Sequence, residues 1–443
     1  MTLDDLLAPF HDAEKPASRW RVGTEAEKFG VRLEDGSPLP FEGDGGVRQV
    51  LLELEDRHGW HSDREHAAGD VISLRRGDAS ITLEPGAQLE LSGAPLTTIH
   101  QTCAEFRGHM AELRDISDEL GIAWLGLGFH PLATQAELPW VPKLRYAIMK
   151  EYLPTRGSMG LDMMRRTATV QANFDYASED DAARKLRVSL ALSPIVGAMF
   201  ANSPFVEGRA TGERSHRLRV WLDVDPDRSG LLPFAWSDGF RYRDYVEWAL
   251  DVPMFGFKRG GELIRNTQQT FRMFMTDGQG GHEPTLTDWQ THINTLFPEV
   301  RLKNTIEVRS ADSQSTPMIC AMPALLKGIL YEESALQAAE AAVSGLDFAT
   351  VQAARADIAQ RGLRAELAGR ELAEWAQQVL EIAEGGLERL SHLDRQGRDE
   401  RIHLASLRKL VERGMTPADA LLEAIDMEQP LLPQLLESGN ARL

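Results

Sequence analysis

The chain has 443 residues, more than a single hydrophobic core accommodates, so one large domain with a smaller appended one is expected. Hydrophobic residues make up 42% and charged residues 26%, which excludes wholesale disorder. The 48 Lys and Arg residues against 67 Asp and Glu residues give a net charge of −19. Because no basic run offsets this acidity, nucleic acid and anionic membranes are excluded as expected partners.

The N-terminal stretch 1–15 reads MTLDDLLAPFHDAEK. Asp4 and Asp5 stand where a secretory signal would be basic, and no segment of the chain reaches the roughly 18 consecutive apolar residues of a membrane span. The only two cysteines, Cys103 and Cys320, have neither zinc-site nor CxxC spacing. These features predict a cytoplasmic protein that does not enter membranes.

Two segments in the first hundred residues alternate as β-strands do, with neighbours of one parity sharing a face. In 21–29, Glu25 and Glu27 project to the face opposite Val22, Thr24 and Ala26. The segment 81–91 predicts a second strand, bulged at Pro85-Gly86, with leucines on one face. Its other face carries Glu84, Gln88 and Glu90.

Two later segments show the same alternation. In 167–175, an apolar face of Val170, Ala172 and Phe174 opposes a polar one. That polar face carries Thr169, Gln171, Asn173 and Asp175. In 305–310, the polar face carries Glu307 and Arg309.

Each polar face taken alone is typical of an antiparallel strand with one side in water. Their shared composition favours another interpretation, because five carboxylates from separate strands repel one another unless a cation lies among them. Carboxylate and amide oxygens without His or thiolate suit Mg²⁺ rather than zinc. Arg309 is then placed to contact a phosphate; the alternative is a salt bridge to a neighbouring glutamate. No GxxxxGK[ST] loop is present.

After Tyr331 the sequence pattern becomes helical. The spacing of Leu372, Trp375, Val379 and Ile382 predicts a helix that Gly385-Gly386 would end. A further helix is expected over 401–413, and Thr416-Pro417 reads as the N-cap and first position of another. We therefore predict a domain of residues 1–335 and a helical region of residues 336–443 packed on it.

Seven ordered blocks resemble the plant and proteobacterial type of glutamate–cysteine ligase. They read RVGTEAEKFGV (21–31), ITLEPGAQLELSGAP (81–95), LGLGFHP (125–131), RYAIMKEYLP (145–154), GSMGLDMMRRTATVQANFDY (157–176), ANSPFVEG (201–208) and FPEVRLK (297–303). The resemblance runs from about residue 18 to the C-terminus. It implies an α+β fold: a glutamine-synthetase-like antiparallel β-sheet funnel flanked by helices, with a helical C-terminal region.

The resemblance also implies roles for individual residues. Arg309 would contact the transferring phosphate, and two or three Mg²⁺ ions would bind the acidic positions, with Gln171 standing where one branch of the superfamily has a histidine ligand. The implied metal ligands are Glu25, Glu27, Glu84, Glu90, Gln171 and Glu307. The implied substrate-binding residues are Arg145, Arg166, Arg217, Tyr146, Thr169, Asn173 and Trp221, with the three arginines as alternatives for the α-carboxylate of glutamate.

The activity implied is the ATP-dependent joining of the γ-carboxylate of glutamate to the amine of cysteine through a γ-glutamyl phosphate. Glutamate, cysteine and ATP would be the partners of a monomer or homodimer. Residues 310–316, SADSQST, depart from the family pattern GADGGPW, which leaves the amine open. The alternatives are a ligase for another amine and a non-catalytic homologue that binds nucleotide or glutamate.

The resemblance gives the two cysteines a further reading. Cys103 and Cys320 lie at positions where plant relatives have a regulatory disulfide, which makes them a candidate redox pair. The alternative is two buried free thiols, because disulfides are rare in cytosolic proteins.

Overall fold

A computed structural model describes residues 1–64 and 69–438, and its centre is a nine-stranded sheet. The strands are ordered β14-β15-β7-β1-β5-β4-β3-β2, with β6 paired to the far end of β1, and every pairing is antiparallel. Their bounds are β1 Val22–Arg32, β2 His61–Asp63, β3 Ser73–Arg76, β4 Ala79–Leu83, β5 Leu89–Ser92, β6 Ile122–Leu125, β7 Thr169–Phe174, β14 Val300–Leu302 and β15 Ile306–Asp312.

The register places the predicted polar residues in rows across the sheet. Glu27 pairs with Glu90, and Glu25 pairs with Gln171. Glu307 pairs with Asn173. Since directly opposed residues share a face, strands far apart in the sequence build one polar surface.

The opposite face of the sheet is apolar, as the alternation predicted. Val22 and Ala26 on β1, Val170 and Phe174 on β7, and Val308 on β15 are all at most 1% exposed. Helix α12 (Ala321–Leu330) packs against β7 and β1, and α6 (Glu179–Met199) packs against β15. Burial of this face fixes which side chains turn the other way.

The segment 81–91 is a hairpin, so the prediction of one bulged strand is wrong. β4 ends at Leu83, and β5 returns antiparallel from Leu89. Pro85-Gly86 makes the turn, with Ala87 in the left-handed region at φ 65°. Glu84 starts the turn and Glu90 lies on the returning strand, so the carboxylates stay on the polar side.

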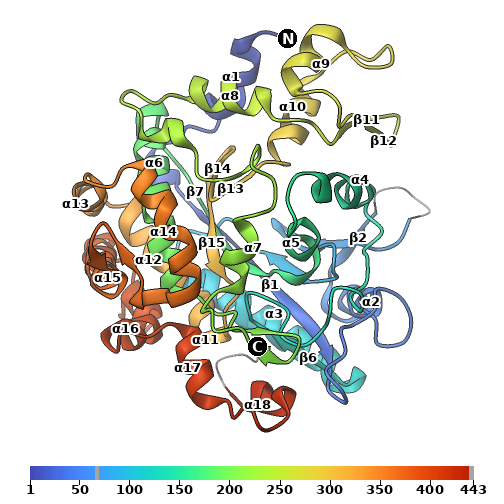
Figure 1. The fold of residues 1–443 in the computed structure, drawn as a ribbon, viewed down its shortest axis with the longest axis vertical. Helices are drawn as coiled ribbons and strands as arrows, with labels where there is room; N and C mark the ends of the chain where they lie inside the picture. The colour runs from blue at the N-terminus through green and yellow to red at the C-terminus, as the bar shows by residue number, and fades with distance from the viewer. Residues whose placement is uncertain (65–68, 439–443) are drawn as a thin grey trace.

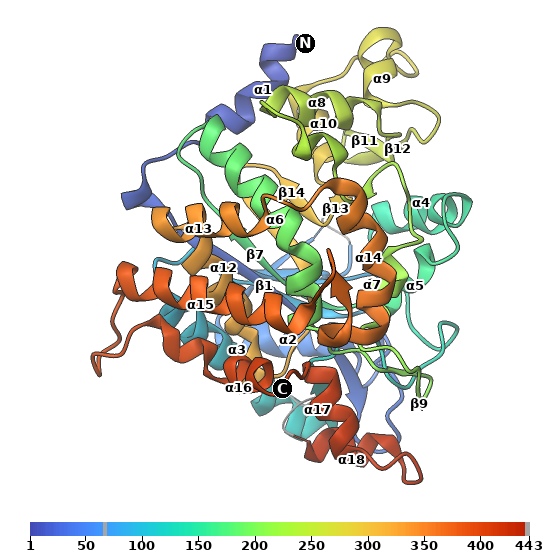
Figure 2. The same ribbon diagram turned by 60° about the vertical axis from the view of Figure 1, so that its left-hand side comes forward.

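Helices surround the sheet on several sides (Figures 1 and 2). The remaining helices before residue 320 are α1 Leu3–His11, α2 Val47–His58, α3 Ile99–Leu120, α4 Leu144–Tyr152, α5 Gly160–Arg166, α7 His216–Trp221, α8 Tyr242–Asp251, α9 Phe271–Asp277, α10 Leu286–Ile293 and α11 Thr316–Ile319. In both views α1, α8, α9 and α10 gather with the hairpin β11 (Gly256–Arg259) and β12 (Glu262–Arg265) at one end of the molecule.

The C-terminal region is helical, as predicted. Its helices are α13 Glu333–Val343, α14 Phe348–Arg361, α15 Leu372–Leu390, α16 Ala405–Glu412, α17 Pro417–Ala424 and α18 Leu431–Glu437. α13 and α14 pack on α6, and α15 packs on α12 (Figure 2). One cluster of buried apolar side chains runs from Leu6 to Val411, so the division at residues 335 and 336 stays a prediction. No helix in 1–64 and 69–438 is both long and apolar enough to cross a membrane.

The glycine pair in α15 does not end that helix, which continues to Leu390. A Cβ on Gly386 would lie 1.8 Å from the Gly328 carbonyl oxygen, and a Cβ on Gly328 would lie 2.2 Å from that of Ala383. The glycines therefore allow α12 and α15 to approach closely, a role that sequence spacing alone does not distinguish from a stop. The expected helix over 401–413 is a 3-10 turn, Glu400–Leu404, followed by α16. Thr416 caps α17 as predicted.

Candidate active site

The polar face of the sheet lines a cavity of about 740 Å³. All five predicted glutamates reach this cavity, together with Gln171 and Arg309. The strands that deliver them are β1, the β4–β5 hairpin, β7 and β15. The titratable residues lining it are Glu25, Glu27, Glu84, Glu90, Lys143, Arg145, Lys258, Arg301, Lys303, Glu307 and Arg309.

Three of these carboxylates, Glu27, Glu84 and Glu90, form a group that we name the carboxylate cluster. Burial raises the pKa of Glu27 well above its ordinary value, and the neighbouring charges of Glu84 and Glu90 raise it further. Burial, with the charges of Glu25 and Glu84, raises the pKa of Glu90 to about 8. Among its contacts, Glu27 accepts a hydrogen bond from the backbone N–H of Thr169 at 3.0 Å. The nearby cations therefore do not offset the burial and mutual repulsion of this cluster.

Glu307 has the opposite surroundings. Its carboxylate accepts hydrogen bonds from Arg301 at 2.7 and 3.0 Å, from Lys303 at 2.7 Å and from Arg309 at 2.8 Å. Burial alone would raise the pKa of Glu307, but the three cations lower it well below the ordinary value. We name Glu307 and its three partners the cationic cluster, since three positive charges surround one negative charge.

Arg309 lies at a β-bulge. The pairing of β15 with β7 shifts register between Val308 and Ala311, and the Arg309 N–H donates to the Glu299 carbonyl at 3.1 Å. Its guanidinium donates to the side chains of Gln171 and Glu307. Arg309 therefore forms the salt bridge that the sequence analysis gave as the alternative to phosphate contact, and it also lines the cavity. Gln171 orients that arginine through the same oxygen that a metal would use.

A smaller pocket of about 80 Å³ opens beside the cavity and shares Glu27, Glu84, Arg145 and Arg309 with it. Among the predicted substrate residues, Arg145, Tyr146, Thr169, Arg217 and Trp221 line this pocket.

Two donors of this inner pocket lack partners among the described residues. The Nε of buried Arg217 and the Nε1 of Trp221 have no acceptor, although another nitrogen of Arg217 donates to the Arg309 carbonyl at 2.9 Å. Both side chains come from α7, whose N-cap is Ser215. Unpaired donors in an enclosed pocket suit an anionic group of a ligand.

Two predicted substrate residues are engaged elsewhere. Arg166 does not line the pocket: it pairs with Asp162 at 3.2 Å and Glu207 at 3.2 Å. Asn173 donates to Glu25 at 2.9 Å and accepts from Thr305 at 3.0 Å, so it holds a carboxylate of the cavity. Asn173 lies on the polar side of β7, as its strand pattern predicted, and the substrate-binding role of both residues stays a prediction.

Three cations near the glutamates were not predicted. Arg301 and Lys303 lie within the FPEVRLK block, and their spacing of two residues, in β14 and directly after it, was the available signal. Lys28 is a fully buried residue of β1, and its Nζ donates to the Ala26 and Leu89 carbonyls at 3.3 Å. Burial lowers the pKa of Lys28 to about 7, against the opposing effect of Glu90 and Glu27. Because Lys28 directly follows Glu27 in the strand, alternation places its side chain on the opposite face of the sheet.

The donor set suits a hard cation, although no three acidic, His or Cys side chains in the described ranges are arranged to hold a metal ion as they stand. The carboxylate cluster contains oxygen ligands alone, as Mg²⁺ prefers. Its members lie around one cavity and repel one another, which keeps their oxygens apart. Rotation of these side chains toward a shared ion would relieve that repulsion, so the residues fit the group.

Comparison with known proteins identifies close relatives. A family model described as glutamate-cysteine ligase family 2 matches residues 21–438. The chain is 40% identical to glutamate–cysteine ligase B of Oryza sativa subsp. japonica, covering 98% of this chain and 87% of that protein. It is 41% identical to the glutamate–cysteine ligase of Brassica juncea, covering 98% and 84%. The resemblance predicted from sequence motifs is confirmed.

A solved structure supports the fold class. The chain matches a glutamate–cysteine ligase of Francisella tularensis in complex with AMP at a TM-score of 0.51 and 13% identity, covering 91% of this chain and 84% of that one. The predicted α+β, glutamine-synthetase-like fold is confirmed, and the antiparallel sheet is open at its edges. The prediction of a cytoplasmic location is contradicted, because the plant relatives are chloroplastic proteins.

Proposed function

Because the chain belongs to glutamate–cysteine ligase family 2, we propose that it uses ATP to join the γ-carboxylate of glutamate to the amine of cysteine. The observation that carries this proposal is one cavity in which a carboxylate cluster and a cationic cluster adjoin an enclosed pocket with unpaired donors. The relatives named as glutamate–cysteine ligases support the same reaction.

The inner pocket suits glutamate. Arg217 and Trp221 offer their unpaired donors to its α-carboxylate, and Arg145 adds a positive charge at the boundary with the larger cavity. Arg166 has carboxylate partners of its own, so Arg217 and Arg145 are the better candidates among the three arginines. Tyr146 closes the wall and donates to the Leu83 carbonyl at 2.9 Å.

The larger cavity suits ATP with its cations. Glu25, Glu27, Glu84 and Glu90 would hold two or three Mg²⁺ ions, and Gln171 and Glu307 remain candidates that must first exchange their present partners. When bound, Mg²⁺ supplies charge neutralisation between a carboxylate and a triphosphate. The structural likeness to a glutamate–cysteine ligase solved in complex with AMP supports a nucleotide here.

The chain's own residues then perform the chemistry. The γ-carboxylate of glutamate attacks the γ-phosphorus of ATP, which breaks the bond to ADP and gives γ-glutamyl phosphate. Arg309 stabilises the charge on the transferred group, since its guanidinium lines both the pocket and the cavity. The enclosed pocket keeps water from the acyl phosphate. The cysteine amine finally displaces phosphate, and the protein acts as a monomer or homodimer.

A product assay tests the proposal. The purified protein is incubated with ATP, Mg²⁺ and glutamate, with cysteine or a panel of other amino acids and diamines, and both ADP and the coupled product are quantified. We expect ADP release that depends on cysteine and a product with the mass of γ-glutamylcysteine. Preference for another amine would identify the alternative ligase, and ATP binding without ADP release for any amine would identify a non-catalytic homologue.

A pair of arginine variants tests the assignment of the pocket. Arg217→Lys is expected to raise the KM for glutamate about 30-fold, since roughly 2 kcal/mol of charged hydrogen bonding is lost. Arg166→Lys is the matched comparison, because it is equally buried but faces Asp162 and Glu207. An equal rise in KM for both variants would contradict the assignment.

A further inference from the structure

Asp312 is a buried aspartate that no step of the proposed reaction uses. It is the last residue of β15, it pairs with Thr169 on β7, and it is 0% exposed. A Cβ on Gly128 would lie 2.2 Å from the Cγ of Asp312, so the absence of a side chain at Gly128 makes room for the carboxylate. Asp312 also belongs to the part of 310–316 that keeps the family pattern.

Three donors surround the Asp312 carboxylate. Its Oδ2 accepts from the backbone N–H of Asn202 and from the Oγ of Ser203, both at 2.7 Å. Its Oδ1 accepts from the Oγ of Ser215 at 2.9 Å. The Nη1 of Arg217 lies 3.9 Å from the same Oδ1. The buried carboxylate is therefore satisfied by hydrogen bonds from two separate segments of the chain.

The direction of the two hydroxyls links Asp312 to helix α7. An ionised carboxylate only accepts, so Ser203 and Ser215 each donate their single hydrogen to it and keep their lone pairs for other donors. The Oγ of Ser203 accepts from the backbone N–H of Arg217 at 3.1 Å, and the Oγ of Ser215 accepts from that of Leu218 at 3.0 Å. Both N–H groups belong to the first turn of α7, where a helix offers no acceptor of its own.

Helix α7 lies against β15 and carries two side chains of the inner pocket (Figure 1). Arg217 and Trp221 are four residues apart, so they share a face of the helix, and both line the pocket. Their unpaired donors are the Nε of Arg217 and the Nε1 of Trp221. A rotation or shift of the first turn of α7 would therefore move both donors together.

Asp312 is joined to the carboxylate cluster on its other side. Its partner Thr169 donates its backbone N–H to Glu27 at 3.0 Å, and the next residue, Ser313, donates its Oγ to the Glu27 carbonyl at 2.5 Å. Thr169 also donates its Oγ1 to the Ala311 carbonyl at 2.6 Å. Asp312 thus lies between a residue proposed to hold a cation and the helix proposed to hold glutamate.

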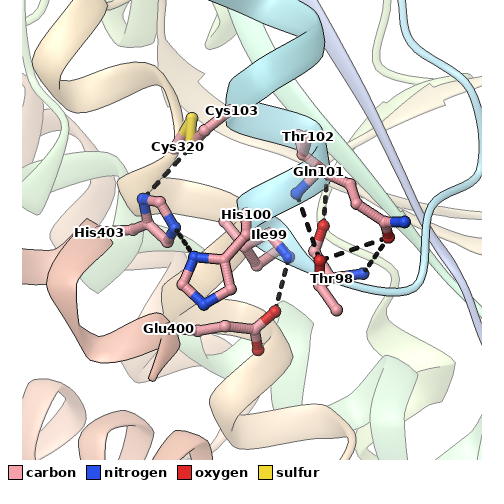
Figure 3. The surroundings of a disulfide bond; sticks show 9 residues. All are labelled: Thr98, Ile99, His100, Gln101, Thr102, Cys103, Cys320, Glu400 and His403. Carbon is pink, nitrogen blue, oxygen red and sulfur yellow. Dashed lines mark hydrogen bonds between the residues drawn. A yellow bond between two sulfur atoms is a disulfide. The ribbon is translucent and has the colours of Figure 1, made fainter. Parts of the chain in front are cut away.

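The segment that begins at Asp312 is held at its far end by the two cysteines (Figure 3). After α11, Cys320 forms a disulfide with Cys103 on α3, with the two Cα atoms 5.9 Å apart. Cys103 is 3% exposed and Cys320 is 7% exposed. The candidate pairing of the two cysteines is thus present in the structure, and a response to redox state stays a prediction. Hydrogen bonds at one end and the disulfide at the other hold residues 312–320 in place.

We propose that Asp312 is a positioning residue for glutamate, an inference that rests on the function proposed for the inner pocket. Its carboxylate directs the hydroxyls of Ser203 and Ser215 toward the first turn of α7, and this sets the donors of Arg217 and Trp221 for the α-carboxylate. Asp312 touches no substrate, so it is not a catalytic residue. If it only stabilised the fold, its loss would lower stability without changing the KM for glutamate.

Asp312→Asn removes the charge and reverses one hydrogen bond. The Asn202 N–H only donates, so the amide oxygen must face Asn202 and Ser203, and the amide NH2 then faces Ser215. The Ser215 hydroxyl loses its acceptor and has to turn, which weakens its bond to the Leu218 N–H. We expect the KM for glutamate to rise about tenfold, while kcat and the KM for ATP stay within about twofold. Steady-state ADP release measures all three.

Asp225→Asn is the matched control for loss of a buried charge. Asp225 is also 0% exposed, but its carboxylate binds Arg228 at 2.6 Å instead of the two serines. This variant should be less stable in thermal unfolding and should keep the KM for glutamate of the wild type. An equal rise in KM for both variants, or an unchanged KM for Asp312→Asn, would overturn the proposal.

Ser203→Ala and Ser215→Ala test the same hydrogen bonds even where Asp312→Asn does not fold. Each keeps the carboxylate but removes one acceptor of the first turn, so each should raise the KM for glutamate about fivefold. Ser193→Ala, at a buried serine of α6 that donates to the Leu190 carbonyl at 2.8 Å, should leave the KM unchanged. No rise in KM for either serine variant would also overturn the proposal.

Hydrogen exchange separates this inference from the proposed function, because it needs no substrate. The backbone amides of residues 216–222 should exchange about tenfold faster in Asp312→Asn than in the wild type, while those of α15 keep their rate. Unchanged exchange in 216–222 would overturn the inference even if the enzyme is active. Faster exchange in a protein whose wild type releases no ADP with glutamate would instead refute the proposed function and retain Asp312 as the residue that positions α7.

Discussion

The two clusters that line the cavity have opposite electrostatics. The carboxylate cluster gathers Glu27, Glu84 and Glu90, and the pKa of Glu27 and of Glu90 is raised by burial and mutual repulsion. In the cationic cluster, Glu307 alone is surrounded by three cations, and its pKa is lowered. The nearby cations therefore leave the repulsion within the carboxylate cluster uncompensated, whereas in the cationic cluster they outnumber the single carboxylate.

This contrast indicates what each end binds. In the proposed reaction, cations would complete the carboxylate cluster, and an anion would complete the cationic cluster, which has a surplus of two positive charges. A nucleoside triphosphate bound to magnesium ions supplies both the cations and the anionic phosphate groups. The two clusters thus present charge complementary to this ligand. Substitutions in the carboxylate cluster and in the cationic cluster should therefore have different kinetic effects.

The largest effect is expected at the carboxylate cluster. Glu27→Gln keeps the size of the side chain and an acceptor for the Thr169 N–H, but removes a charge from the proposed cation site. Ligase activity at saturating substrate should fall at least about 1,000-fold, equivalent to about 4 kcal/mol of barrier. ADP release measures this. Glu366→Gln, on an exposed residue, is the control, and wild-type activity of Glu27→Gln would refute a metal role for the cluster.

Arg309→Lys should lower kcat about 100-fold, because a lysine keeps the charge beside Glu307 but cannot reproduce the planar fork at the transferred phosphate. The KM for glutamate should change little. Arg184→Lys, at a surface arginine bonded to Glu333 and Glu340, provides the comparison in steady-state kinetics. A change in KM alone would assign Arg309 to substrate binding and contradict a role in phosphate transfer.

The sequence predicted the faces of the strands better than their partners. Parity within 21–29 and 167–175 placed Glu25, Glu27 and Gln171 on the polar side, because alternation is a local property of a strand. Which strands meet depends on contacts between residues far apart in the chain, such as Glu307 with Asn173. Only the family resemblance supplied that arrangement in advance.

Two local predictions were wrong for the same physical reason. The Pro85-Gly86 pair is compatible with either a bulge or a turn. The pairing of Leu89 with Leu83 shows that the segment forms a hairpin. Gly386 is compatible with either a helix end or a close contact between helices. The packing of α15 against α12 shows that it forms a close contact. The substrate-binding role of Arg166 stays a prediction from its motif, and the acceptors that hold its side chain, Asp162 and Glu207, are set by tertiary structure. Local sequence restricts such choices, and packing selects among them.

Lys303→Gln tests the surplus charge of the cationic cluster. Glu307 keeps Arg301 and Arg309, so the fold should persist, but one of three cations facing the cavity is lost. The KM for ATP should rise about tenfold, or about 1.4 kcal/mol, while the KM for glutamate stays within about twofold. Lys258→Gln, at another lysine that lines the cavity, shows whether any lost cation has this effect. An unchanged KM for ATP would mean that the surplus is not used.

The smallest effect is a dependence of Mg²⁺ affinity on pH. The pKa of Glu90 is about 8 in the folded protein and 4.5 ordinarily, so between these values the folded state holds a proton that the unfolded state has released. Metal-free stability should therefore decrease as the pH rises through this interval. Mg²⁺ binds the deprotonated form, so its affinity should rise about fivefold from pH 7 to pH 8 if one proton is displaced.

Calorimetric titration with Mg²⁺ in two buffers of different protonation enthalpy counts the protons released at pH 7. The count belongs to the coupled carboxylates rather than to Glu90 alone, because Glu25 and Glu84 raise its pKa through their charges. Glu90→Gln should weaken binding and also remove most of the proton release, whereas Lys303→Gln should leave the release intact. A Mg²⁺ affinity that is independent of pH in the wild type would place the cation away from the carboxylate cluster. It would then contradict the assignment of cations to one cluster and anions to the other.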